Sequence, residues 1–351
     1  MSITQDGSTQ ATSGEPQLHP GDQHEIPSVE AHGSFDSLKD RIKLHYNVAS
    51  DYYYSLWGQH IHHGLFRTAG ESKEQAQVNL INLLLEISAL PPRARVLDVG
   101  CGVGGTSRFL ARERGCNVTG ITISGRQVEI ARQVTAAEIG SSGATSTTST
   151  TTSTTTTTSD SKPDSLEVME YPAEDGKPGG AVRFLELDAE KMAERLGAEG
   201  TSFDCVWISE ALSHLPDKEL FFSSAHALVG PGGLLVVADW FRAPGLTVAQ
   251  EEADIKPIED GMLLPRLYTA DEYVAMAEKV GFRVRKAPVD ISKDVAKTWD
   301  ISWSLVSSPS LWAFAISQGR DGLAFLQAFR AMRRGYANGT FRYAVMCFEK
   351  S

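Results

Sequence analysis

Cysteine is scarce in this sequence of 351 residues. The four cysteines, Cys101, Cys116, Cys205 and Cys347, show neither the C-x-x-C spacing of a zinc or redox site nor the density of a disulfide scaffold. Their scarcity excludes the small disulfide-rich classes and indicates a reducing compartment, for which the cytoplasm is the default. No spacing of metal ligands stands out, so we expect no metal ion.

The sequence also lacks long apolar runs and an excess of positive charge. No run approaches the roughly 18 apolar residues of a membrane helix. Residues 1–34 contain no Lys or Arg, which fits neither a secretory signal nor an Arg-rich transit peptide. In the whole chain, 33 Lys and Arg face 44 Asp and Glu, for a formal net charge of −11. Because binding to a phosphate backbone relies on clustered positive charge, we expect no nucleic-acid partner. The sequence does not indicate an oligomeric state.

What the sequence does contain is a regular alternation of short apolar runs and helix-like segments. This alternation predicts parallel strands joined by helical crossovers, an α/β fold. A late helix is expected to begin at the capping box Thr269–Glu272 and to end at Gly281. The last two of the seven expected strands form an antiparallel, hairpin-like edge. The expected strands are 95–100, 117–122, 182–187, 203–208, 233–239, 282–289 and 341–349.

Two segments lack any core-forming pattern, and two others interrupt the sheet. Residues 1–34 are polar and aperiodic, which predicts a disordered tail before a single domain over 35–351. A Ser/Thr-rich block with Gly and Pro, at about 140–180, predicts a surface insertion. The segments at about 244–268 and 290–335 are mixed and helical, and their Trp, Leu and Phe content predicts an apolar cap.

A glycine-rich stretch follows the first expected strand. In "VLDVGCGVGG", residues 96–105, Gly100, Gly102 and Gly105 have the G-x-G-x-x-G spacing of a dinucleotide-binding loop. Such a site also needs an Asp or Glu about 20 residues further on, where it binds the ribose hydroxyls. The second strand instead ends in "GITIS", residues 120–124, with hydroxyl groups and no acid. The stretch therefore argues against a nicotinamide cofactor.

An acidic residue beside this loop points to a different ligand. Asp98 lies two positions before the first glycine, where the charge of a pyrophosphate would disfavour a carboxylate. S-adenosylmethionine has no phosphate, and it carries an ammonium group and a cationic sulfonium. A carboxylate near the loop would then lie close to positive charge. The loop favours S-adenosylmethionine, and the alternative is a tight strand-to-helix turn that binds nothing.

Several ordered blocks of the sequence carry a family resemblance. They are "VLDVGCGVGGTSRFLA", "VTGITISGRQVEIAR", "FDCVWISEALSHLPDKELF" and "PGGLLVVADW", preceded by "HYNVASDYYYSLWGQHIHHGLF" at residues 45–66. Together they resemble the gamma-tocopherol methyltransferase group and, more distantly, sterol methyltransferases, cyclopropane fatty acid synthases and bacterial sugar methyltransferases. The resemblance runs from about residue 40 to the C-terminus. It implies the Rossmann-like, seven-stranded sheet of class I methyltransferases, with helices on both faces, a helical cap and S-adenosylmethionine as cofactor.

The resemblance also implies a set of cofactor-binding residues. Thr122, Ile123 and Gln127 would flank the ribose and adenine, although Gln127 could equally be an exposed residue in the first turn of a helix. Asp188 would accept a hydrogen bond from the adenine amino group, and it could also serve as a helix N-cap. The full predicted set is Tyr46, Tyr53, Asp98, Gly100, Gly102, Gly104, Thr122, Ile123, Gln127, Asp188, Ala189 and Ser209.

Methyl transfer from a sulfonium is an in-line displacement, so a closed pocket matters before a base does. Tyr46, Tyr53 and Trp57 are candidates to cover the methyl group and face the sulfonium through cation–π attraction, or they are core aromatics of an N-terminal helix. His214 and Asp239 follow adjacent strands, which predicts an imidazole oriented by a carboxylate as general base. The alternative is a structural histidine before a Leu-Pro turn.

The expected function is methylation of carbon, nitrogen or oxygen on a hydrophobic small molecule, a secondary metabolite. Trp57, His63, Glu210 and Trp240 are the expected substrate-binding residues. A cyclase that keeps the cofactor on the same fold is the main alternative, because fold does not fix chemistry. A non-catalytic binding module is the third hypothesis.

Overall fold

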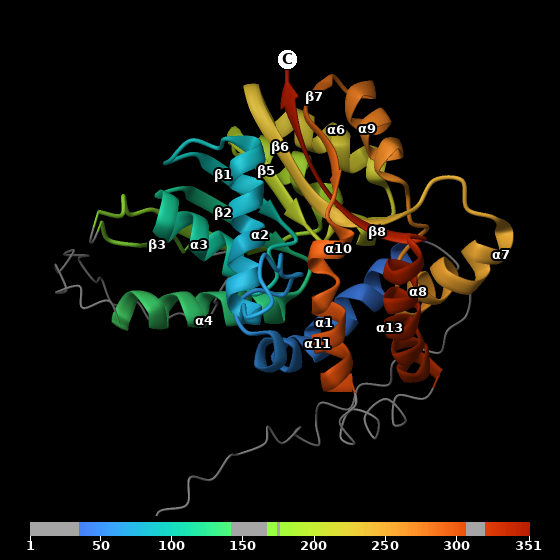
Figure 1. Cartoon of the computed structure of the whole chain (residues 1–351). Helices are drawn as coiled ribbons and strands as arrows, with labels where there is room; N and C mark the ends of the chain where they lie inside the picture. Colours follow the sequence, from blue (N-terminus) through green and yellow to red (C-terminus); the bar gives the residue numbers. More distant parts are fainter. Residues whose placement is uncertain (1–34, 142–166, 174–175, 307–319) are drawn as a thin grey trace, which may run out of the picture.

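The computed structural model describes residues 35–141, 167–173, 176–306 and 320–351, which form one mixed sheet flanked by helices (Figure 1). The predicted disordered tail at 1–34 and the Ser/Thr run lie outside the described residues. No helix in the described ranges is long and apolar enough to cross a membrane.

Five strands are parallel to one another and correspond to the first five expected from the sequence. They are β1 (Arg95–Val99), β2 (Asn117–Thr122), β4 (Ala181–Glu186), β5 (Phe203–Ser209) and β6 (Val229–Arg242). Four of the five residues of β1 are buried, and five of the six residues of β2 are buried. Continuous apolar runs of this kind are typical of parallel strands covered on both faces.

The remaining strands are antiparallel to their neighbours. β7 (Phe282–Asp290) pairs with β8 (Phe341–Lys350), as predicted, but β8 also pairs with β6 and so lies inside the sheet. An unpredicted strand, β3 (Met169–Glu170), pairs with β4 at the opposite edge. The order across the eight strands is β3-β4-β2-β1-β5-β6-β8-β7. The α/β sheet expected from the sequence is confirmed, with one short strand added.

The end of the predicted surface insertion belongs to the folded body. Met169 and Tyr171 are 8% and 6% exposed and pack in the core, and the Tyr171 hydroxyl donates to Glu138 Oε2 at 2.9 Å. The insertion predicted at about 140–180 is therefore too long at its C-terminal end. Met169 and Tyr171 are two isolated apolar residues beside a tract of Ser, Thr, Gly and Pro. Such a short pattern does not predict a strand of two residues.

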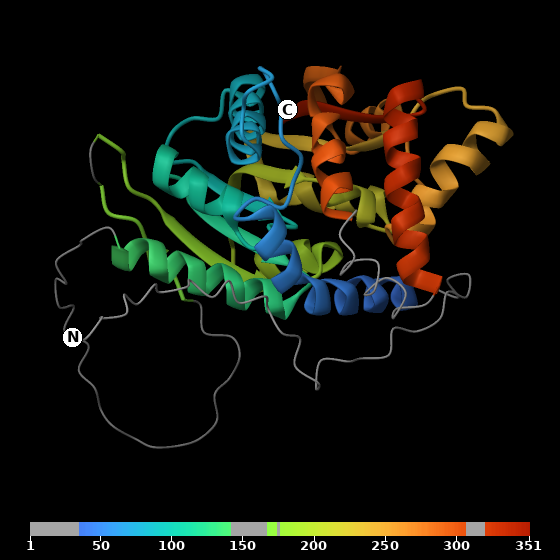
Figure 2. The ribbon, with the colours of Figure 1, turned by 60° about the horizontal axis from the view of Figure 1, so that its bottom comes forward.

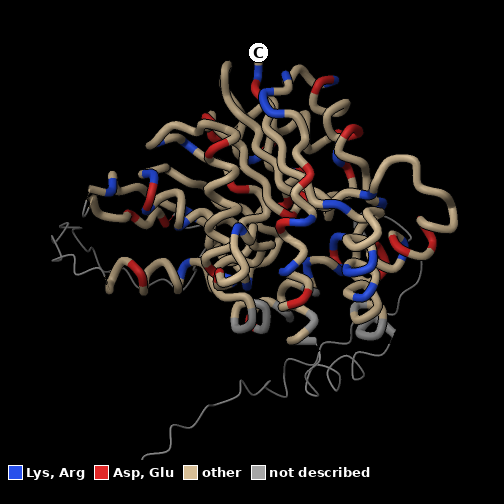
Figure 3. The backbone as a smooth tube through the Cα atoms, in the orientation of Figure 1, with Lys and Arg blue, Asp and Glu red and all other residues tan. Residues whose placement is uncertain are grey.

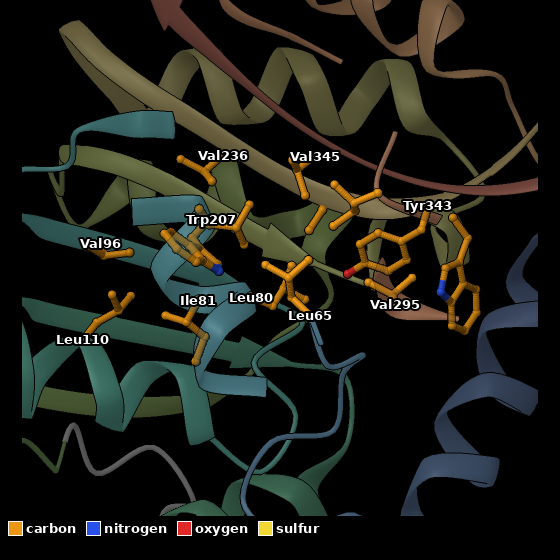
Figure 4. Packing of buried hydrophobic residues seen from close by; sticks show 14 of the residues in the cluster. Leu65, Leu80, Ile81, Val96, Leu110, Trp207, Val236, Val295, Tyr343 and Val345 are labelled. Atoms are coloured by element: carbon orange, nitrogen blue, oxygen red, sulfur yellow. The ribbon is translucent and has the colours of Figure 1, made fainter. Parts of the chain in front are cut away.

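Helices cover both faces of the sheet, as predicted. Successive side chains of β1 point to opposite faces of the sheet. Val96 packs with Leu80 and Leu110 in one hydrophobic cluster, and Leu97 packs in the other. Figure 4 shows Leu80 and Ile81 lying over Val96, Trp207 and Val236. The first layer contains α2 (Lys73–Ser88), α3 (Gly105–Arg114) and α4 (Gly125–Ser141), and the second contains α5 (Met192–Ala198), α6 (Lys218–Leu228) and α9 (Ala270–Lys279).

Further helices gather at one end of the sheet and form the predicted cap. Figures 1 and 2 show α1 running across this end beside α11 and α13. The helix α9 begins at the predicted capping box, with Thr269 and Glu272 bonded in both directions. The cap contains α1 (Phe35–Trp57), α7 (Val248–Gln250), the π-helix η3 (Glu251–Ile255), α8 (Lys256–Gly261), α10 (Ser292–Val295), α11 (Lys297–Val306) and α13 (Arg320–Asn338). Two short 3-10 helices, η1 (Ala189–Lys191) and η2 (Leu212–His214), follow strands β4 and β5.

Charges on the cap are mixed in sign. Lys and Arg along α13 and its neighbours stand among Asp and Glu (Figure 3). Arg333 pairs with Asp300 at 2.9 Å, and Arg334 pairs with Asp254 at 2.5 Å. These arginines are therefore engaged with acidic side chains of the same molecule.

The last glycine of the glycine-rich stretch is required by packing. A Cβ on Gly105, the first residue of α3, would collide with the backbone oxygen of Gln59 in the segment between α1 and α2. We predict that Gly105→Ala lowers the free energy of unfolding by roughly 1–3 kcal/mol or more, as overpacking does. Gly197→Ala is the matched control, because nothing lies within 4 Å of its added methyl group in α5. Chemical denaturation of both variants measures the effect, and equal stabilities would contradict it.

Candidate active site

The glycine-rich loop is fixed by backbone hydrogen bonds to the next strand. The amides of Gly100 and Cys101 donate to the Ile121 oxygen at 2.9 and 3.0 Å. The buried Arg108 donates from Nη1 to the Val103 oxygen at 2.6 Å. These bonds hold the loop at the carboxyl ends of β1 and β2, where α/β sheets bind their ligands.

A cavity of about 130 Å³ opens beside this loop, and we call it the glycine-loop cavity. Gly102 lines it with φ +55°, and a Cβ there would meet no atom within 4 Å, so the backbone itself faces open space. Nine of the twelve predicted cofactor-binding residues line this cavity. They are Tyr46, Gly100, Gly102, Thr122, Ile123, Gln127, Asp188, Ala189 and Ser209.

The polar side chains of this cavity are held by specific partners. Thr122 Oγ1 donates to Gln127 Oε1 at 2.6 Å, and Gln127 is buried, so its interpretation as an exposed helix residue is wrong. Asp188 accepts from the Glu190 amide at 2.9 Å as the N-cap of η1, and also from Lys39 Nζ of α1 at 3.2 Å. The N-cap interpretation of Asp188 is therefore confirmed, and it leaves the carboxylate at the cavity wall.

The donor set fits S-adenosylmethionine. The buried Oγ of Ser209 lines the cavity without a hydrogen-bond partner among the described residues, so it is available to a polar ligand. Two acidic residues, Asp188 and Glu210, and one basic residue, Lys39, line the cavity. This balance suits a ligand with cationic groups better than a pyrophosphate.

The structure places the other three predicted cofactor residues differently. Asp98 is 3% exposed, does not line the cavity, and accepts a hydrogen bond of 2.6 Å from Ser107 in the first turn of α3. Burial raises the pKa of Asp98 to about 6, although the bonds from Ser107 oppose the shift. Gly104 has φ +79°, and its Cβ would collide with the Phe184 ring. The side chain of Tyr53 lies outside the described residues. The cofactor role of all three stays a prediction.

A second cavity of about 120 Å³ lies under the cap, and we call it the aromatic cavity. All four predicted substrate-binding residues, Trp57, His63, Glu210 and Trp240, line it. The cap adds apolar residues that the sequence did not single out, since their role depends on where distant helices pack. They are Ile42, Ile61, Met262, Leu263, Trp299 and Phe329.

The two cavities meet at a shared wall. Five residues line both of them: Ile42, Tyr46, Ile61, Glu210 and His214. The Tyr46 hydroxyl lies 3.4 Å from His214 Nε2, and the two rings meet edge to face with centroids 5.9 Å apart. A reaction between a ligand in each cavity would take place at this wall.

The Glu210 carboxylate contacts three polar groups of the site. Its Oε1 accepts from the His63 amide at 2.6 Å and from the Tyr343 hydroxyl at 2.8 Å, while Oε2 lies 2.8 Å from His63 Nδ1. Its backbone has φ +55°, a conformation that residues other than glycine rarely adopt. Burial opposes ionisation of Glu210, but the His63 charge and these hydrogen bonds outweigh it and hold the pKa below its ordinary value.

The predicted pairing of His214 with Asp239 stays a prediction, and the structure gives Asp239 other hydrogen-bond partners. Asp239 is fully buried, lines neither cavity, and accepts from the Trp240 amide at 2.9 Å and from the Tyr273 hydroxyl at 3.3 Å. Burial raises the pKa of Asp239, against the hydrogen bond from the Trp240 amide and the attraction of Lys218. Adjacent strand ends bring the two residues near each other, but the Asp239 side chain points to the face of the sheet covered by α9.

Comparison with known proteins decides the family. The family model described as a methyltransferase domain matches residues 72–287, well over half of the chain. The chain belongs to the methyltransferase domain family. It is an S-adenosylmethionine-dependent methyltransferase, as the resemblance implied.

Named relatives and solved structures agree with this assignment. The methyltransferase is 28% identical over 335 residues to a probable chloroplastic tocopherol O-methyltransferase of Oryza sativa, covering 89% of this chain and 78% of that one. It is 34% identical over 189 residues to the 2-methyl-6-phytyl-1,4-hydroquinone methyltransferase of Synechocystis, covering 52% and 45%. A mycolic acid cyclopropane synthase solved with SAH and CTAB shares its fold, with a TM-score of 0.67, 18% identity and coverage of 89% and 98%.

The buried Asp98 predicts a pH dependence of stability. Because its folded pKa of about 6 exceeds the ordinary 3.8, the protonated form stabilises the fold below about pH 4, and this contribution is lost as the pH rises through 6. The corresponding decrease in the free energy of unfolding is on the order of 3 kcal/mol. Asp98→Asn keeps an acceptor for Ser107 and cannot ionise. We predict that the stability of the variant relative to the wild type increases between about pH 4 and about pH 7 in denaturant titrations. A difference that stays constant over this range would contradict the raised pKa.

Proposed function

We propose that the methyltransferase binds S-adenosylmethionine in the glycine-loop cavity and a hydrophobic acceptor in the aromatic cavity. The single observation that carries this proposal is the wall that both cavities share, formed by Tyr46, Glu210, His214 and two isoleucines. Because the two cavities are adjacent at these residues, a ligand in one cavity would lie next to a ligand in the other. Holding the two reactants in line supplies much of the rate of a methyl transfer.

The chain's own residues give each ligand a distinct environment. When bound, S-adenosylmethionine supplies an electrophilic methyl group on a cationic sulfonium. The glycine backbone, Thr122, Gln127, Asp188 and Ser209 would hold its polar groups. Tyr46 would cover the junction beside His214, where aromatic faces attract a cation.

The aromatic cavity supports a hydrophobic acceptor. Trp57, Trp240 and Trp299 line it together with aliphatic residues of the cap, which matches sites for apolar ligands with few polar groups. The relatives reported above are named for tocopherol and for a phytyl hydroquinone, both apolar molecules with a ring. We infer an acceptor of this general kind. A role in secondary metabolism and a cytoplasmic location stay predictions, since the relative from rice is named as chloroplastic.

A cyclase with retained cofactor is the weaker alternative. It needs the same two cavities but no group that accepts a proton from the substrate. The family and the curated relatives are named for methyl transfer, which favours methylation.

Calorimetry on the purified chain tests the cofactor half of the proposal. S-adenosylmethionine and its demethylated product should bind, and a nicotinamide dinucleotide should give no heat. Ser209→Ala removes the available hydroxyl of the glycine-loop cavity and should weaken S-adenosylmethionine binding by roughly two- to tenfold, the worth of one hydrogen bond. Ser223→Ala, on the exposed side of α6, is the control and should bind like the wild type. Nicotinamide binding with no heat from S-adenosylmethionine would refute the proposal.

A further inference from the structure

One ring nitrogen at the wall of the aromatic cavity is buried without a hydrogen-bond partner among the described residues. His63 is 3% exposed, and its Nε2 has no hydrogen-bond partner among the described residues. The residue lines the aromatic cavity, while its Nδ1 lies against the Glu210 carboxylate at 2.8 Å. A buried polar atom without a partner is rare and needs an explanation.

The Glu210 contact determines which nitrogen of the neutral ring can accept a proton. A carboxylate only accepts hydrogen bonds, so the hydrogen of the neutral imidazole is on Nδ1 and the lone pair is on Nε2. The backbone amide of His63 also donates to Glu210, and Tyr343 donates to the same carboxylate from β8. The ring is therefore fixed in place with its basic nitrogen unengaged.

Aromatic groups surround this imidazole. The ring centroids of Trp299, Tyr343 and Trp240 lie 4.9, 5.0 and 5.9 Å from that of His63. Among the described residues, the titratable groups around it are Glu210, Tyr343, Tyr336 on α13 and the neighbouring His62. Glu210 is the only carboxylate among them, and it can stabilise an imidazolium once His63 has taken a proton.

We propose that His63 is the catalytic base of this methyltransferase, that Glu210 positions it, and that the acceptor is a phenol or enol whose hydroxyl proton passes to Nε2. This inference rests on the proposed function and names the acceptor class. The acceptor O–H bond breaks, and its proton is bonded by Nε2. The ionised acceptor then bonds the methyl carbon through its oxygen, and the carbon–sulfur bond breaks with its electron pair kept by sulfur, which becomes a neutral thioether.

In a phenol the ring carbon next to the hydroxyl shares the negative charge and can bond the methyl carbon in place of the oxygen. The His63 imidazolium returns the first proton to the phenol oxygen, and the carbon then passes its own hydrogen as a proton to Nε2, which restores the aromatic ring. Both outcomes begin with the same proton transfer to His63.

The chemistry of other acceptors does not need this base. A neutral amine or an alkene attacks with an electron pair that it already has, so proton removal does not precede methyl transfer. An aliphatic alcohol is a much weaker acid than a phenol, so its proton passes less readily to an imidazole. A phenol has a pKa near 10 and an imidazole one near 6.5, a gap that a positioned base can bridge.

Variants of His63 test the proposal. His63→Asn places an amide N–H where Nδ1 lies, so it can keep the bond to Glu210 while lacking a base. His63→Ala removes both the bond to Glu210 and the base. With 2-methyl-6-phytyl-1,4-hydroquinone as probe acceptor and S-adenosylmethionine labelled in its methyl group, both variants should lower kcat by roughly 10²- to 10⁴-fold. Added imidazole should partly restore His63→Ala, and the alkaline rise of the wild-type kcat/KM profile should be absent from both variants.

Two further variants separate positioning from loss of fold. Glu210→Gln should lower kcat less than His63→Ala and displace the same limb of the pH profile, as expected for a group that acts through His63. His226→Gln, on α6 beside Phe282, is the matched histidine control and should retain wild-type rates. Melting temperature and S-adenosylmethionine affinity are measured for every variant.

Each result decides between the possibilities. Full activity in a folded His63→Asn enzyme would overturn the base assignment, as would loss of the pH limb in His214→Ala with its retention in the His63 variants. A wild-type enzyme that binds S-adenosylmethionine but methylates neither this hydroquinone nor tocopherol would overturn the acceptor class. Failure to bind S-adenosylmethionine at all would instead count against the proposed function.

Discussion

The buried carboxylate of Glu210 is the interaction on which the site depends. It joins the segment after α1, the end of β5 and the strand β8 through hydrogen bonds to His63 and Tyr343. Placing a charge there is unfavourable by itself, and so is the left-handed backbone of Glu210. Three hydrogen bonds and the nearby imidazole offset these costs. Strain of this kind is characteristic of functional positions, where the surrounding fold holds a residue in a conformation that it would not adopt alone.

The same contact links residues of the two cavities, which the proposed function combines into one reaction site. Glu210 follows the strand that flanks the glycine loop, yet its carboxylate reaches the loop that carries His63 under the cap. The cap helices contribute apolar walls, and α1 crosses from one cavity to the other with Tyr46 facing His214. The glycine-loop cavity and the aromatic cavity therefore share a wall whose polar groups are already oriented. Such pre-organisation lets catalysis proceed with little rearrangement of the protein's own dipoles.

The sequence predicted what depends on local pattern. Parallel strands buried on both faces show as apolar runs, and the glycine loop shows by its spacing. The sheet could therefore be predicted, and nine of the predicted residues line one cavity. Features that depend on long-range pairing could not. The position of β8 between β6 and β7 depends on pairing between strands far apart in the sequence. The strand β3 has only two residues, too few to show a pattern. The His63–Glu210 contact spans 147 residues, whereas adjacent strand ends favoured Asp239 as the partner of a histidine. Neighbouring positions at a sheet edge do not determine where a side chain points.

The central claim, that Glu210 is an ionised carboxylate fixed by His63, is most directly tested by ¹³C NMR titration of its side-chain carboxyl carbon. The signal is assigned by its loss in Glu210→Gln. Because the attraction of the His63 charge and the hydrogen bonds outweighs burial, the account predicts a midpoint below the ordinary value of 4.5 in the folded chain. A midpoint above 4.5 would show that burial dominates, that the carboxyl group is held in its protonated form, and that it does not orient His63 as a carboxylate.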